Sequence, residues 1–105
     1  MIGPLKHRIA LLKANFTSDT GGGAEIAYVP EETVWAAREI IADTKILKAD
    51  ALRRTQRIRF TIRTRQNMSL IERIIYDGRM FEVISLSGVG PNDRYLSIIA
   101  DEVGI

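Results

Sequence analysis

The chain has 105 residues, of which 46% are hydrophobic and 27% charged, and a formal net charge of +2. This length and balance predict a single globular domain over residues 1–105, and so small a charge does not by itself indicate nucleic-acid binding. The absence of cysteine excludes disulfides and thiolate metal sites, and no apolar run reaches the roughly 18 residues that a membrane-spanning helix requires. The first residues lack the apolar core of a signal peptide, so we expect a chain made in the cytoplasm with no membrane partner.

The first half of the chain gives mixed secondary-structure signals. Residues 5–13 alternate apolar and polar side chains, which predicts a half-buried strand, and residues 15–23 are rich in small turn-forming residues, which predicts a loop. Residues 33–41 combine helix-favouring and strand-favouring side chains, and we interpret them as a strand. Residues 46–54 have loosely helical spacing and predict one short helix.

The second half gives clearer strand signals. Four strands are predicted, at residues 57–65, 70–76, 80–86 and 95–100. Asp77 and Gly78 lie between two apolar runs, which predicts a tight type I′ hairpin turn, and residues 88–93 predict a loop. The expected fold is therefore mainly β: a small antiparallel barrel or sandwich with five or six strands, long loops and at most one short helix.

No group of side chains in the sequence suggests catalysis or metal binding. His7 is the only histidine, and it lies on the same side of its predicted strand as Ile9 and Leu11, so we expect it to be hydrogen-bonded and partly buried. The run Gly21–Gly23 is not followed by the Gly-Lys-Ser/Thr of a phosphate-binding loop. We therefore expect no catalytic residue, no metal, no cofactor and no small-molecule substrate.

The stretch RIRFTIRTR, residues 57–65, is the one unusual feature. In a strand its arginines share one face while the alternate residues face the core. The arginine face holds Arg57, Arg59, Arg63 and Arg65, interrupted by Thr61, and the core face holds Ile58, Phe60, Ile62 and Thr64.

The sequence leaves two interpretations of the arginine face open. In the first, the face is solvated and its charges are relieved by acids on neighbouring strands, such as Glu72, Asp77 or Glu82. In the second, it meets a partner, either the phosphates of DNA or an acidic surface on another subunit. Arginine serves all of these roles, so its presence does not distinguish them.

Four segments in order resemble the phage head-tail joining family. They are IGPLKHRI at residues 2–9, VWAA at residues 34–37, RFTIRTR at residues 59–65 and RIIYDGRMFEVI at residues 73–84. Members of this family are the small head-completion or stopper proteins of long-tailed phages and of phage-derived gene transfer particles. The resemblance extends over roughly the whole chain. It differs at Thr64, where members often have an aromatic residue that places the end of the strand in the core.

The resemblance implies a small β-barrel without enzymatic activity or cofactor, made in the bacterial host and located at the head-tail interface of the particle. Such a barrel assembles as a ring, with portal and adaptor proteins above, tail proteins below and packaged double-stranded DNA in the channel. The segment 17–25 is then a candidate assembly loop. Its candidate residues are Asp19, Gly21, Gly22, Gly23 and Glu25.

The same resemblance makes Arg57, Arg59, Arg63 and Arg65 candidates for subunit or ring-to-ring contacts, or for the DNA channel. We favour protein contacts, since a channel that transmits DNA quickly should not grip it. The alternative function is a single-stranded nucleic-acid-binding module with an OB-like barrel, which the basic strand would suit. Against it, no aromatic residue is interleaved among the arginines, and Phe60 lies on the buried side of the strand.

Overall fold

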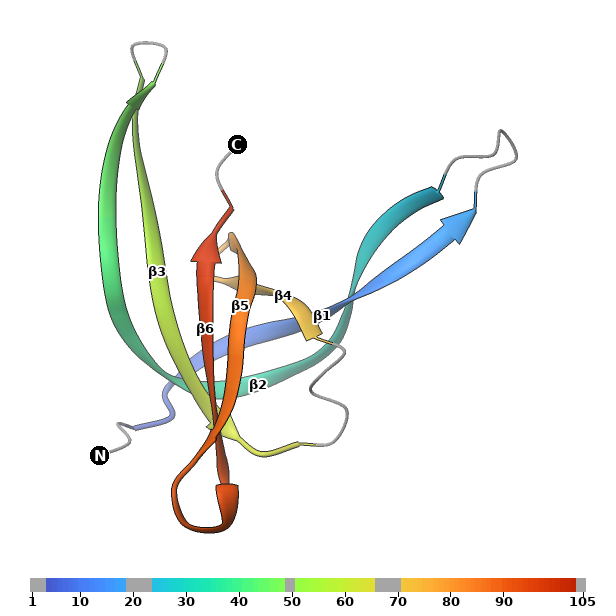
Figure 1. Cartoon of the computed structure of the whole chain (residues 1–105), viewed down its shortest axis with the longest axis vertical. Helices are drawn as coiled ribbons and strands as arrows, with labels where there is room; N and C mark the ends of the chain where they lie inside the picture. The colour runs from blue at the N-terminus through green and yellow to red at the C-terminus, as the bar shows by residue number, and fades with distance from the viewer. Residues whose placement is uncertain (1–3, 19–23, 49–50, 66–70, 104–105) are drawn as a thin grey trace.

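The chain folds as a closed antiparallel β-barrel (Figure 1). The computed structural model describes residues 4–18, 24–48, 51–65 and 71–103. Its strands are β1 (His7–Ser18), β2 (Ala24–Lys48), β3 (Ala51–Arg63), β4 (Ile71–Tyr76), β5 (Arg79–Val89) and β6 (Tyr95–Glu102). Around the barrel they follow the order β1-β2-β3-β6-β5-β4, and β4 pairs back onto β1 to close it. The expected mainly-β fold is confirmed, in its barrel form.

The helix expected at residues 46–54 is wrong. Ile46 pairs with Arg53 and Leu47 with Leu52, so this segment is the end of a β2–β3 ribbon. The two strands supply each other's backbone hydrogen bonds, and this pairing outweighs a weak helical spacing. Across the part of the chain that is described, no helix is long and apolar enough to cross a membrane.

The loop expected at residues 15–23 is wrong for residues 15–18. β1 continues through Asn15 to Ser18, and Glu25 lies in β2 opposite Thr17 instead of in a loop. Asp19 and Gly21–Gly23 lie outside the described residues. In Figure 1 the β1–β2 and β2–β3 ribbons extend well beyond the barrel in different directions.

The hairpin predicted at Asp77 and Gly78 is confirmed. Their φ angles are 54° and 72°, both positive as a type I′ turn requires, and Tyr76 pairs with Arg79 on either side. The later loop begins after Val89 and contains a short 3₁₀ turn, η2 (Pro91–Asp93).

The barrel interior is filled by alternate apolar residues from all six strands. Phe60 lies fully buried in it, with its ring edge-on to those of Phe81 and Tyr76 at centroid distances of 5.8 and 5.5 Å. The buried cluster consists of Ile9, Leu11, Val34, Ala36, Ile58, Phe60, Ile62, Ile71, Ile74, Phe81, Ile98 and Ala100.

His7 is hydrogen-bonded and half-buried, as expected from the sequence. Its Nδ1 lies 3.0 Å from the Tyr76 hydroxyl, and the two rings meet edge to face. Burial lowers the pKa of His7, and the positive charges of Arg38 and Lys6 lower it further.

We expect His7 to titrate with a midpoint below its ordinary value of 6.5. Because the unfolded chain then binds the proton more readily, stability is full above about pH 6.5 and falls as the pH drops through the folded-state pKa. An NMR titration of this single histidine measures the midpoint directly. The variant His7→Gln should lose this part of the pH dependence of unfolding, and a midpoint at or above 6.5 would contradict the prediction.

Candidate functional site

β3 places its arginines on the outside of the barrel, as the alternation predicted. Ile58, Phe60 and Ile62 are at most 1% exposed, whereas the arginine side chains reach solvent. Thr64, expected on the core face, is instead exposed beyond the end of β3. Its hydroxyl donates a hydrogen bond to the Asp93 carbonyl, and its N–H donates one to the Arg94 carbonyl at 2.8 Å. These bonds attach the end of the strand to the loop before β6.

Three of the four arginines are held in ion pairs by neighbouring strands. The pairs are Arg57 with Asp101 (2.5 and 2.9 Å), Arg59 with Glu39 (2.8 Å) and Arg65 with Glu32. The hydrogen bonds from Arg57 lower the pKa of Asp101 below its usual value. These pairs are exposed, so each contributes little to the free energy of folding. Each pair nevertheless makes its arginine less available for an ion pair with a binding partner.

The partner acids suggested from the sequence, Glu72, Asp77 and Glu82, are wrong. They lie on β4, on β5 and in the turn between those strands, whereas β3 is bordered by β2 and β6. The acids that do pair with the arginines therefore come from β2 and β6. These acids can be identified only from the order of the strands around the barrel.

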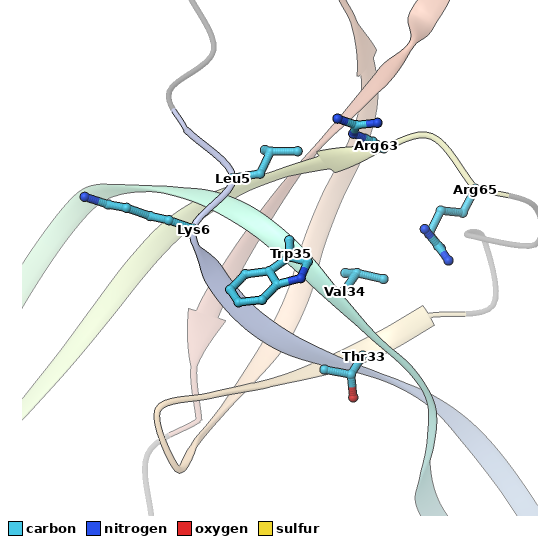
Figure 2. Close-up of a pocket in the computed structure, with 7 residues that line it drawn as sticks. All are labelled: Leu5, Lys6, Thr33, Val34, Trp35, Arg63 and Arg65. Atoms are coloured by element: carbon cyan, nitrogen blue, oxygen red, sulfur yellow. The ribbon is translucent and has the colours of Figure 1, made fainter.

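Arg63 differs from the other three arginines. Within the described part of the chain it has no acidic partner, and it lines a pocket of about 780 Å³ near the start of β1 (Figure 2). We call this the Trp35 pocket. Its lining residues are Leu5, Lys6, Thr33, Val34, Trp35, Arg63 and Arg65.

Trp35 is the largest exposed apolar side chain at this site, with 53% of its surface exposed. It lies between the buried residues Val34 and Ala36, so strand alternation turns its indole outward. Across the β1–β2 pair it faces Arg8, whose guanidinium carbon lies 5.2 Å from the indole centroid. This cation–π contact holds the ring without covering it.

The Trp35 pocket therefore combines apolar surface with uncompensated positive charge. Lys6 and Arg63 have no acidic partner among the described residues, and the nearby Glu32 is already held by Arg65. Tryptophan and arginine at a pocket are the residue types that dominate binding energy at protein interfaces. The arrangement suits a ligand or protein segment that offers both a carboxylate or phosphate and an apolar group.

Trp35 was not predicted as a surface residue from the sequence, where it was noted only within the motif VWAA. The available signal was its position between two small or branched apolar residues in a predicted strand, which puts the indole on the solvent side. The other candidates do not join this site: Asp77 and Gly78 form the β4–β5 turn, and Glu25 lies in the β1–β2 ribbon.

No side-chain arrangement typical of a metal site occurs in the described ranges, where no three histidine, aspartate or glutamate side chains gather to hold an ion. Nor do those ranges contain a buried side-chain nitrogen or oxygen without a hydrogen-bond partner.

Comparison with known proteins identifies what this barrel is similar to. A family described as phage head completion protein matches residues 1–103. A chain in the virion of a native gene transfer agent particle is 18% identical, with a TM-score of 0.74 over 96% of this chain and 97% of that one. Protein SF1141 from Shigella flexneri 2a, solved in solution, is 21% identical, with a TM-score of 0.69 over 96% of this chain and 95% of that one. No curated protein sequence matches the chain.

Proposed function

The chain belongs to the phage head completion protein family, and on this premise we propose that it is a stopper, which assembles as a ring below the portal and adaptor of a phage-like particle. Family membership makes it a structural component of a phage or phage-derived particle, where it assembles with other head and tail proteins. The proposed ring retains packaged double-stranded DNA in the head and provides the platform on which the tail docks.

The observation that carries this proposal is the family match over residues 1–103, which spans the whole barrel. The structural neighbour from the gene transfer agent virion supports it, because a barrel of the same fold is part of that particle. The exposed Trp35 pocket supports a role in protein contacts.

The ion pairs of β3 favour protein contacts over a DNA-gripping channel. Arg57, Arg59 and Arg65 are already paired with acids of the same subunit, so much of the positive charge is compensated. Such a surface forms few contacts with the phosphates of DNA in a channel, since each contact needs a cation that is not already paired with an acid.

One observation favours the alternative of a single-stranded nucleic-acid binder. Trp35 is exposed and has Arg8 and Arg63 nearby, and an indole beside arginines can stack on a base. The isolated chain should then bind oligonucleotides with a strong dependence on salt. We expect no such binding, because a single exposed tryptophan does not make the extended platform that tracks a strand.

The proposal is tested with particles produced without this protein. We expect heads that package DNA, lose it on purification and carry no tail. Added back as purified protein, the chain should bind at the portal vertex as a ring visible by cryo-electron microscopy and restore DNA retention and tail attachment. Heads that keep their DNA and take up tails without the chain would refute the proposal.

A further inference from the structure

We propose that the Trp35 pocket of one subunit receives the β5 surface of the next copy of the chain, head to tail around the ring. The β5 surface is defined by Glu82 and Ile84, which lie two residues apart in that strand, on either side of Val83. This inference rests on the proposed ring and adds the surfaces by which its subunits meet.

The β5 surface offers an apolar group that can pack against the apolar lining of the Trp35 pocket. Between Val83 and Ser85 the register of β5 against β6 shifts, which leaves Ile84 as an extra residue without a partner on β6. A bulge of this kind re-aims a side chain, and Ile84 is 51% exposed, a high value for an isoleucine on a barrel strand.

Glu82 supplies a carboxylate that no described residue of its own subunit neutralises. Its cross-strand neighbours are Arg73 on β4 and Asp101 on β6. The guanidinium of Arg73 instead lies over the Tyr28 ring, 4.5 Å from its centroid, and Asp101 is bound by Arg57. Among the described residues Glu82 thus has no ion-pair partner, as Arg63 and Lys6 have none in the pocket.

The barrel places these two surfaces on opposite sides of the molecule. β2, which carries Trp35, borders β1 and β3, whereas β5 borders β6 and β4, so the two strands share no neighbour in the closed order. Two complementary surfaces on opposite sides of one molecule join copies head to tail. Such contacts close into a ring when the rotation from each copy to the next divides evenly into a full turn. Ile84 would pack against Trp35 and Leu5, and Glu82 would accept hydrogen bonds from Arg63 or Lys6.

Cysteine cross-linking tests the contact directly, because the natural chain contains no cysteine. Thr33→Cys places one thiol at the pocket and Ser85→Cys places the other beside Ile84, both at exposed positions. In purified particles carrying the double variant, a short bismaleimide reagent should join each subunit to the next and give a ladder of oligomers. Each single-cysteine variant is the matched control and should give no ladder, because a head-to-tail contact brings together two different positions.

The outcomes separate this inference from the proposed function. Particles that contain the double variant and keep DNA but yield no ladder would overturn the inference and leave the stopper role intact. The inference would also be overturned if Thr33→Cys became cross-linked to an adaptor, portal or tail protein. Cross-linking of Thr33→Cys to packaged DNA, with a reagent that reacts with nucleic acid, would overturn it as well, because either product assigns the pocket to another partner. Absence of the wild-type chain from the particles would refute the function itself.

Charge reversal gives an independent readout of the same contact. Arg63→Glu and Glu82→Arg should each lower the yield of completed particles at least about tenfold, since like charges then face each other, and the double variant should recover most of the yield. The variant Arg63→Glu with Glu31→Arg carries the same formal charge but alters an exposed residue of β2, and it should not recover. Equal recovery in both double variants would show a net-charge effect and contradict the contact.

Discussion

Replacing Phe60 with alanine is expected to lower the free energy of unfolding by about 3–5 kcal/mol. Phe60 is fully buried and contacts the rings of Phe81 and Tyr76, so the substitution opens a cavity at the place where β3, β4 and β5 meet inside the barrel. Domains of this size are stable by only about 5–15 kcal/mol. The variant should therefore be marginally folded or unfolded at 37 °C.

Denaturant unfolding followed by circular dichroism measures this loss, and two controls define its cause. Phe60→Leu keeps most of the volume but loses both edge-to-face ring contacts, and it should cost about 1–2 kcal/mol. Thr61→Ala changes the next residue on the outer face, where the expected effect is about 0.5 kcal/mol. A loss for Phe60→Ala no greater than that for Phe60→Leu would show that the barrel interior is not tightly packed around this ring.

The features of the fold that were predicted correctly are those determined by neighbouring residues. The alternation of Ile58, Phe60 and Ile62 with arginines required a strand with one buried face, and the structure buries all three. Asp77 and Gly78 required a hairpin because both can adopt positive φ, and both do. Each of these signals lies within a few residues and depends on no distant partner.

The features that were missed depend on segments far apart in the chain. Glu39 and Asp101 pair with the arginines because β3 lies between β2 and β6 in the barrel. This order of strands cannot be predicted from any short segment of the sequence. Residues 46–54, the end of the β2–β3 ribbon, were predicted as a helix, and they form strands because pairing between the strands outweighs the propensity of a short segment. The Trp35 pocket likewise needs Leu5 and Arg63 to converge from opposite parts of the sequence.

The pairing of the arginines also changes which of them we expect to contact a neighbour in the proposed ring. Arg59 is already bound to Glu39, so a partner gains little from it without first breaking that pair, whereas the guanidinium of Arg63 is available in the Trp35 pocket. The basic strand is therefore not one continuous positive surface, and Arg63 is the arginine that we expect a partner at the Trp35 pocket to contact.

Replacing Trp35 with alanine is expected to leave the subunit folded and to prevent completion of the particle. The indole is 53% exposed and makes a cation–π contact with Arg8, so the free energy of unfolding should change by about 1 kcal/mol or less. At an interface the same truncation typically costs about 2 kcal/mol or more, and a ring repeats the loss at every contact. The yield of particles that retain DNA and carry tails should fall by at least about 30-fold.

The measurement compares wild type, Trp35→Ala and Trp35→Phe in particles otherwise lacking the protein. Trp35→Phe keeps an aromatic ring in the pocket and should retain most of the yield, because the smaller ring still packs against an apolar side chain of the neighbour. Unfolding curves recorded on the three purified chains establish that any loss comes from assembly. Normal particle yields with Trp35→Ala would show that the pocket is not an assembly contact, and a large fall in its stability would show that Trp35 serves the fold of the subunit instead.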